Sequence, residues 1–442
     1  TGNNSLSWGV WNGSFGGNAN AYELDENGTA IYYNSSGDDG SFTGFRETTE
    51  VDSKATGFNV AWTFSDALSF SFDAHKSKTT TDNGLDKGLG AQARVILGSA
   101  ALSSKEYFFR DGDVPGYNIR WQNGSNELSP NEIGSNFSIF TRTPGESEVE
   151  QVQFGGDWLP ELGYGLKEVS FGAAYTKQSL SGSGGSNNAN APGFNNGTFA
   201  EIFPDSMFTK QGTGNFLDQF SGGGNGLVSN YYYSYSYDEA VARQAAYLTE
   251  ALLGENAYVP DAFYGPYGES YVQEVTDSVY LQSAWEFDVA SFPVQLNVGV
   301  RYEQTDVTSS VLQDVERQVN WVSPSEWIMQ YESGDANFLT LDGSHNVLLP
   351  MLDLRVDLTE DLVSRFSVGK SISRAPLGAL GGGRSLSGSP KPGSRSGGQG
   401  NTNLQPYEST NLDLSLEYYY AEGSYAAVGW FKKDVDNFIQ TT

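Results

Sequence analysis

The chain has 442 residues, and its 54 acidic and 25 basic side chains give a net charge of −29 at pH 7. This charge argues against nucleic-acid binding, because phosphate contacts need clustered Lys and Arg. The chain contains no Cys, and it has no apolar run of about 18 residues, which excludes a transmembrane helix. Its mean hydropathy of −0.42 is that of a polar chain, although 14% of its residues are aromatic.

The first 40 residues are rich in Asn, Gly, Ser and aromatic side chains, and they predict a long external loop with room for a hairpin. The first clear hairpin is predicted over Ser41–Thr81, with a turn at Ser65-Asp66-Ala67. Polar residues such as His75 take one parity of its arms, and apolar residues take the other. The apolar positions are Phe58, Val60, Trp62, Phe64, Leu68, Phe70, Phe72 and Ala74. Such period-two alternation predicts two antiparallel strands with one apolar and one polar face.

The same unit recurs four times along the chain, which predicts five hairpins and therefore ten strands. The later hairpins pair residues 151–158 with 167–178, 277–287 with 293–308, 347–358 with 362–376, and 412–420 with 425–433. A large side chain precedes each short turn. These side chains are Trp62, Trp158, Trp285, Leu358 and Tyr420. Aromatic residues at this depth are typical of the girdle where a membrane protein meets the lipid headgroups.

Long connections alternate with the short turns, over residues 81–150, 181–276, 309–345 and 375–409. This alternation predicts an all-β fold: a transmembrane antiparallel up-and-down β-barrel with periplasmic short turns and long extracellular loops. Its apolar face would meet lipid and its polar face the lumen. Within the loop 181–276, apolar residues at helical spacing predict a short helix over Asp238–Leu253.

Three segments near the C-terminus follow each other at barrel spacing. They are S-I-S-R-A-P (Ser371–Pro376), G-N-T-N-L-Q-P-Y-E-S-T-N (Gly400–Asn411) and F-K-K-D-V-D-N-F-I (Phe431–Ile439). Together they resemble the C-terminal half of the barrel of TonB-dependent outer-membrane receptors. The family pattern usually has Lys-Pro-Glu where this chain has Gln-Pro-Tyr, at residues 405–407, so the match departs slightly there.

This resemblance implies a barrel of about 22 strands, whose wide lumen is closed by a plug. Residues 1–442 would then be part of a single β-barrel domain, an incomplete barrel with the N-terminal plug and the last strands outside it. The resemblance also implies a location in the outer membrane of a Gram-negative bacterium. The implied function is active uptake of a scarce nutrient, driven by the TonB energy-transducing complex acting on the plug, with no enzymatic activity.

Aromatic clusters in the predicted loops are the best candidates for ligand contacts. One cluster lies in the 181–276 loop and comprises Tyr231, Tyr232, Tyr233, Tyr235 and Tyr237. Tyr supplies rigid, amphipathic contact area suited to sugars, aromatic chelates or peptides. The alternative is that these rings pack a small core of the loop or stand in the outer girdle. Trp321 and Trp327 form a second candidate pair. The ligand could be an oligosaccharide, a ferric siderophore or cobalamin, and the aromatic loops favour an organic nutrient such as a carbohydrate.

Other site chemistry finds little support. His75 and His345 are the only histidines, so neither a catalytic triad nor a His-rich metal site is predicted. No cofactor is predicted, although the acidic turns 25–28, 82–86 and 111–113 could bind Ca²⁺; none completes an EF-hand loop. A basic island of Arg384, Lys391 and Arg395 could attract an anionic ligand, but we favour contact with lipopolysaccharide phosphates alongside the outer-membrane lipid.

Two alternative functions stay open. A passive outer-membrane porin would share the barrel and lack the plug. A soluble secreted β-rich protein that binds or cleaves glycans would show no lipid-facing parity. The recurrence of short turns and long loops argues against this soluble alternative.

Overall fold

The computed structural model describes residues 2–11, 19–82, 92–109, 114–189, 199–214, 217–221, 230–248, 268–332, 336–386 and 396–438. The chain divides into two compact units. Unit 1 comprises Thr1–Val51, Asp82–Thr143 and Gly184–Gly265, and unit 2 comprises Asp52–Thr81, Pro144–Ser183 and Pro266–Thr442. Because β3 (Ala30–Ser65) runs through both, each unit is described with its own part of that strand.

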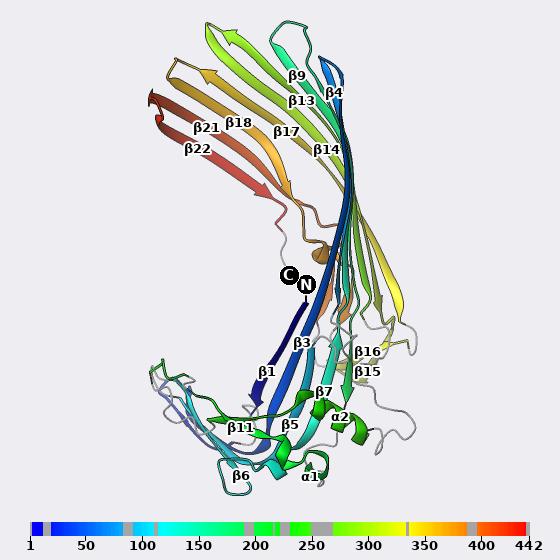
Figure 1. Cartoon of the computed structure of the whole chain (residues 1–442), viewed down its shortest axis with the longest axis vertical. Coiled ribbons are helices and arrows are strands. Elements are labelled where there is room, and N and C mark those ends of the chain that lie inside the picture. Colours follow the sequence, from blue (N-terminus) through cyan, green and yellow to red (C-terminus); the bar gives the residue numbers. More distant parts are fainter. Residues whose placement is uncertain are drawn as a thin grey trace. The chain divides into compact units, whose positions relative to one another are not determined.

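Unit 2 is an antiparallel meander of ten strands (Figure 1). Its order is β3, β4 (Leu68–Asp82), β8 (Gly145–Trp158), β9 (Leu166–Gly182), β13 (Ser270–Val289), β14 (Phe292–Gln313), β17 (Asn337–Asp357), β18 (Leu362–Ser373), β21 (Tyr407–Ala421) and β22 (Ser424–Asp436). The ten predicted strands and their five short-turn hairpins are confirmed. The all-β, transmembrane up-and-down architecture follows from this order.

One face of the unit 2 sheet is apolar in continuous rows that cross the strands. One such row joins neighbouring strands in register from Phe72 to Leu348. Its members are Phe72, Phe154, Ala173, Val279, Tyr302 and Leu348. Four residues further from the short turns, the same face carries Lys76, Glu150 and Lys177 in register. The apolar residues therefore form a band bounded by charge, and this is the face that meets lipid.

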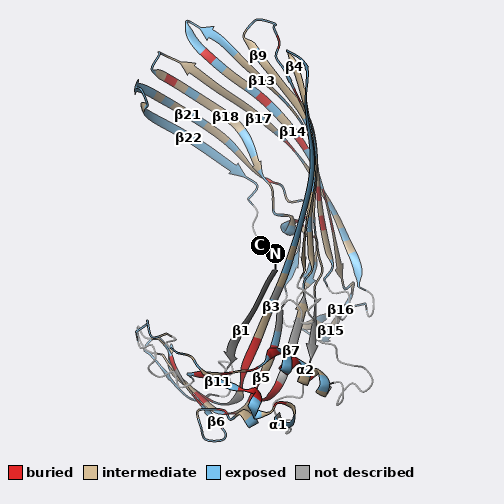
Figure 2. Ribbon diagram, viewed as in Figure 1, coloured by how far each residue is buried: buried red, intermediate tan, exposed pale blue. Residues whose placement is uncertain are grey.

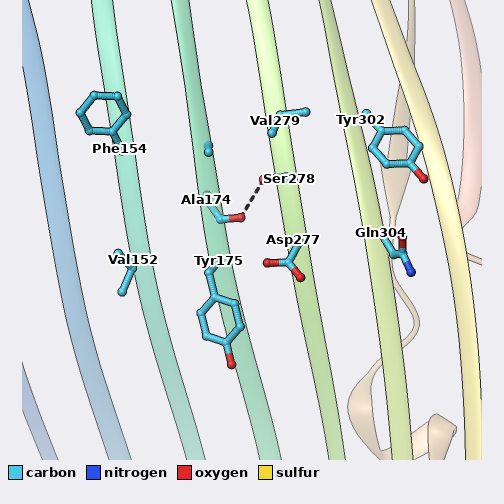
Figure 3. A pocket seen from close by; sticks show the side chains of 10 residues that line it. Val152, Phe154, Ala174, Tyr175, Asp277, Ser278, Val279, Tyr302 and Gln304 are labelled. Carbon is cyan, nitrogen blue, oxygen red and sulfur yellow. Dashed lines mark hydrogen bonds between the residues drawn. The ribbon is translucent and has the colours of Figure 1, made fainter.

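A hollow of about 460 Å³ interrupts this apolar face near its polar margin (Figure 3). Its walls come from four neighbouring strands and include Phe154, Tyr175 and Tyr302, with the small Ala173 between them. Beside it, the hydroxyl of Ser278 donates a hydrogen bond to the carbonyl oxygen of Ala174, at 3.4 Å. Because the hollow opens on the lipid side of the sheet, it is not a site for a molecule inside the lumen.

Several strands are longer than the alternation predicts. Strand β14 continues to Gln313, past the predicted end at residue 308, and β17 begins at Asn337, ten residues before the predicted start. The two strands stay paired over this extension, from Ser309 with Leu341 to Gln313 with Asn337. Beyond the lipid band neither face has to be apolar, so pairing continues where the period-two signal ends.

Smaller elements lie in the connections of unit 2. The hairpin β15 (Glu316–Ser323) and β16 (Glu326–Tyr331) forms a two-stranded sheet of its own between β14 and β17. After β18 come the short helix η5 (Leu377–Leu380) and the strands β19 (Arg384–Leu386) and β20 (Gly397–Gln399), which pair with each other.

Unit 1 contains the remaining elements. These are β1 (Gly2–Trp11), β2 (Ala19–Leu24), β5 (Gln92–Phe108), β6 (Gly116–Trp121), η2 (Pro130–Glu132), β7 (Gly134–Arg142), β10 (Gly185–Ala189), α1 (Phe199–Ile202), η3 (Asp205–Met207), β11 (Thr209–Gly212), β12 (Tyr231–Ser234) and α2 (Tyr237–Leu248). Figure 2 shows buried residues gathered along β3 and β5 in this unit. No helix in the described part of the chain is long and apolar enough to cross a membrane.

Unit 1 is richer in strands than its sequence suggests. Residues 1–40, predicted as a loop with room for a hairpin, hold β1, β2 and the start of β3. The predicted connection 81–150 contains β5, β6 and β7. These strands alternate weakly because they carry Gly, Ser and Asn on both faces. Helix α2 lies where the amphipathic spacing predicts a helix, and residues 249–253 of that prediction lie outside the described residues.

The unit 2 sheet is open, so it is an incomplete barrel. Among the described residues, β22 pairs only with β21, and residues 52–65 of β3 pair only with β4. Unpaired N–H and C=O groups at these two edges are not tolerated by lipid. In a membrane both edges therefore need pairing partners.

The turn between β13 and β14 gives a test of backbone strain. Val289 pairs with Phe292, and the two residues between them, Ala290 and Ser291, have φ of 51° and 76°. A two-residue turn of this kind favours Asn-Gly. We expect Ala290→Asn with Ser291→Gly to raise the free energy of unfolding by about 1 kcal/mol, measured by urea titration in lipid vesicles. Gly423→Ala, at φ of 72° with open space around it, should lower it by a similar amount.

The lipid-facing band gives a second test. Leu414 lies on the apolar face with 48% of its surface exposed, which in water would make an Arg tolerable. If lipid covers this face, Leu414→Arg lowers the free energy of unfolding by about 2–4 kcal/mol, the range for a charge near the middle of the bilayer. Phe431→Arg, on the opposite face and in register with Asp413, is the matched control and should cost little. Equal urea midpoints for the two variants would contradict a lipid-facing band.

Candidate functional site

The face of unit 2 opposite the lipid band carries the polar side chains, and we call it the lumenal face. Arg355 donates to Asp357 at 2.9 Å, and Arg365 donates to Glu417 at 3.1 Å across β18 and β21. These pairs are partly exposed, so they suit a water-filled lumen and contribute little stability individually.

Arg374, directly after β18, contacts two buried carboxylates of this face. Its guanidinium forms ion pairs with Glu274 of β13 and Glu303 of β14, and it donates to the hydroxyl of Thr276 at 2.6 Å. The two glutamates are only 5% and 6% exposed. Arg301 also donates to Glu303, at 2.6 Å. Removing one partner from such a buried group leaves an uncompensated charge, so the arrangement is specific for a cation at position 374.

From Arg374 the chain lies along the lumenal face of β14. We call residues 374–386 and 397–404 the strap. Leu380 is buried against Val307 and Val272, the N–H of Gly382 donates to the hydroxyl of Ser309 at 2.7 Å, and the N–H of Arg384 donates to the amide oxygen of Gln313 at 2.9 Å. The strap thus follows β14 from Glu303 to Gln313, about 33 Å of strand.

The returning part of the strap is held by close backbone packing. The hydroxyl of Thr402, a buried residue, donates to the carbonyl oxygen of Asp342 at 3.1 Å. A Cβ added to Gly343 would lie 2.2 Å from the carbonyl oxygen of Thr402, and one added to Gly400 would lie 1.3 Å from that of Gly381. Only glycine fits at these two positions. The G-N-T sequence at 400–402 is therefore a packing motif.

The far end of the strap reaches the β15–β16 hairpin. A guanidinium nitrogen of Arg384 lies 3.4 Å from a carboxylate oxygen of Glu316, the first residue of β15. On this hairpin Trp321 and Trp327, both predicted as ligand contacts, face each other in register. The structure thus brings the two predicted tryptophans together. Trp321 is 67% exposed, and with Val322 it lines a shallow hollow of about 420 Å³.

The predicted tyrosine cluster lies in unit 1 and is mostly buried. The rings of Tyr231, Tyr233, Tyr235 and Tyr237 belong to the core of this unit, and Tyr232 packs against it partly exposed. This matches the alternative given for the sequence, in which the tyrosine rings pack a small core of the loop and do not form a ligand surface. They offer little contact surface to an external ligand in this arrangement, and ligand binding by them stays a prediction.

The tyrosine hydroxyls bond to backbone groups of the loop before η2 and of β3. Tyr231 accepts from the N–H of Leu128 at 2.8 Å, and Tyr233 donates to the carbonyl oxygen of the same residue at 3.0 Å. Tyr235 accepts from the N–H of Gly44 at 3.1 Å. Burial raises the pKa of Tyr231 to about 12, and it also raises the pKa values of Tyr233 and Tyr235.

The acidic turns predicted as Ca²⁺ sites are only partly described. Asp25 uses one carboxylate oxygen to accept from the N–H groups of Asn27 and Thr29, at 2.9 and 2.7 Å. This is a hairpin turn that its own side chain stabilises. The turns 83–86 and 111–113 lie outside the described residues. Within the described ranges no three His, Asp or Glu side chains converge as metal ligands, and Ca²⁺ binding stays a prediction.

The motif segments, the strap and the strands of the meander from β8 to β22 all fall within one family match. Residues 97–442 match the family model described as TonB dependent receptor-like, beta-barrel. The chain belongs to the TonB-dependent receptor family. Members of this family are transporters of the Gram-negative outer membrane, and they are not enzymes.

Solved structures of other TonB-dependent receptors share little sequence with this chain. The alcaligin outer-membrane receptor FauA of Bordetella pertussis is 11% identical, with a TM-score of 0.32 and coverage of 93% of this chain and 50% of that one. The hemophore receptor HasR of Serratia marcescens is 13% identical, with a TM-score of 0.31 and coverage of 99% and 55%. The chain spans about half the length of these receptors. No curated protein matches it.

Sequence reasoning missed the role of Arg374 in this receptor chain. The residue stands inside the motif S-I-S-R-A-P, but alternation says nothing about a side chain beyond the last strand residue. A usable signal lies in Glu274 and Glu303. Both lie at alternate positions on the polar face of their strands, beyond the lipid band. Two buried acids on paired strands require a cation between them.

The buried tyrosines predict alkaline sensitivity of unit 1. An unfolded Tyr ionises near pH 10, whereas Tyr231 ionises in the folded unit only near a pKa of about 12. The free energy of unfolding is therefore constant below pH 10 and falls between pH 10 and 12, by about 1 kcal/mol per pH unit for this residue. Tyr231→Phe should make the fall shallower, followed by fluorescence of the buried Trp121. Tyr164→Phe, at a side chain 96% exposed, should leave it unchanged.

Proposed function

We propose that the protein carrying this chain is an outer-membrane receptor that actively imports a scarce nutrient. The tryptophan pair on a hairpin outside the lipid band carries this proposal, because it places an aromatic surface, with Trp321 exposed, on the long-loop side. Trp321 stands opposite Trp327, and Arg384 of the strap contacts the first residue of the same hairpin. Aromatic faces of this kind are enriched at the centres of binding surfaces.

The ligand class that fits this hairpin best is an oligosaccharide or a similar organic nutrient. The opposite face of the hairpin presents amide groups, since Gln318 donates to Asn320 and to Gln330, both at 2.9 Å. The aromatic face alone suits a sugar, because the rings of Trp321 and Trp327 can stack on the apolar face of a sugar ring. A ferric siderophore is the second ligand class.

Energy for import would come from the TonB complex of the inner membrane, acting through a plug domain in the lumen. This follows from the family and not from any contact in this chain. The barrel wall would supply the lipid-matched band. Arg384 of the basic island lies in the strap and contacts Glu316, so only the rest of the island would be free to meet lipopolysaccharide phosphates. Residues 391 and 395 of that island lie outside the described residues.

The tryptophan pair gives the test of this function. We expect Trp321→Ala to weaken binding of the cognate nutrient at least tenfold, because a central aromatic contact is worth more than about 1 kcal/mol. The measurement is calorimetry on the purified full-length protein, against a panel of oligosaccharides and ferric chelates.

The matched control is Ile328→Ala, next to Trp327 on the opposite face of β16. It should leave the affinity unchanged. Equal affinities of the Trp321 variant and the wild type would remove the hairpin from the ligand site. No detectable binding to any member of the panel, together with a steady open conductance in planar bilayers, would instead indicate a passive porin.

A further inference from the structure

The strap is anchored at one end by charge and at the other end by the hairpin. Near the lipid band, Arg374 bridges the buried Glu274 and Glu303. At the other end, Arg384 contacts Gln313 of β14 and Glu316 of β15. One continuous segment therefore connects the lumenal wall with the base of the tryptophan hairpin.

The hairpin needs such support from outside itself. The strands β15 and β16 pair only with each other in the described part of the chain. A two-stranded hairpin alone is at best marginally stable in water. Its amide ladder is exposed, and Trp321 is among the most exposed large side chains. The contact between Arg384 and Glu316 is therefore positioned to hold the hairpin relative to the wall.

The packing of the strap makes it a stiff connection. Leu380 is buried against two residues of the wall, and Thr402 is buried beside Gly343. The outgoing residues 374–386 and the returning residues 397–404 lie in close contact at Gly400. The N–H of Gly400 donates to the carbonyl oxygen of Gly383 at 3.0 Å, and separating the two parts would break this hydrogen bond. Displacement at one end is thus transmitted to the other.

We propose that Arg374 is a positioning residue for the ligand site: its ion pairs with Glu274 and Glu303 seat the strap, and the seated strap holds the Trp321–Trp327 hairpin through Arg384 and Glu316. The ligand part of this inference rests on the proposed function, whereas the mechanical part does not. Because linkage is reciprocal, a ligand that immobilises the hairpin also favours the seated strap and the intact cluster at the lumenal wall.

Hydrogen exchange of the full-length protein, without ligand, tests the mechanical part. Arg374→Met keeps the length of the side chain and removes its charge. We expect amide exchange at least tenfold faster in the strap and also in residues 316–331. Glu316→Gln cuts the other end, so it should speed exchange in the hairpin and leave residues 374–382 protected. Arg355→Met is the control. It removes a lumenal Arg that pairs with Asp357 within the same strand, and it should change neither segment.

A variant with Arg374→Met, Glu274→Gln and Glu303→Gln keeps the test decisive if the single variant does not fold. Neutral amides relieve the buried charges, so this variant should fold with an unanchored strap and a fast-exchanging hairpin. In the double variant of Arg374→Met and Glu316→Gln, hairpin exchange should equal that of Arg374→Met alone, because both changes cut one connection. Unchanged hairpin exchange in the Arg374 variants, or additive effects in the double variant, would overturn the proposal.

The ligand part has its own readout. Once calorimetry identifies a nutrient, Arg374→Met should lower its affinity, and Arg355→Met should not. Retained affinity with a loosened hairpin would overturn the positioning role for ligand binding while leaving the mechanical link intact. Failure to find any nutrient would count against the proposed function and would not alter the exchange result.

Discussion

Backbone groups in a membrane have no water to pair with, and this constraint determines the architecture of unit 2. Every strand must pair with neighbours, so only the side chains can distinguish the lipid side from the lumenal side. The result is visible in the register from Phe72 to Leu348, where apolar residues line one face strand after strand. The opposite face is then free to carry charge.

The freedom of the lumenal face makes the strap possible. Two carboxylates that lipid would exclude, Glu274 and Glu303, lie buried on this face because a guanidinium from a distant part of the chain covers them. A buried ion pair adds little net stability compared with apolar packing, but it is satisfied only when a cation occupies one defined position. Arg374 therefore contributes specificity of position, whereas Leu380 and the glycine contacts contribute packing.

The sequence predicted the ten strands because the lipid band imposes a strict period of two on them. It did not predict their extensions, such as residues 337–346 of β17, where the strap covers one face and lipid no longer imposes a period of two. The facing of Trp321 and Trp327 depends on register in an isolated hairpin, and the core position of Tyr235 depends on contacts with Gly44, 191 residues away. Such contacts are set by tertiary structure, which composition and spacing do not encode.

The rows that cross the sheet also limit how these strands can change in length during evolution. Tyr302 lies in register with Val279 on one side and with Leu348 on the other. Loss of one residue from the middle of β14 would turn every later side chain to the wrong face, including Glu303. Loss of two residues would keep each side chain on its face and only shift its row. Insertions and deletions within the membrane-spanning strands should therefore come in even numbers, while the connections can change by single residues.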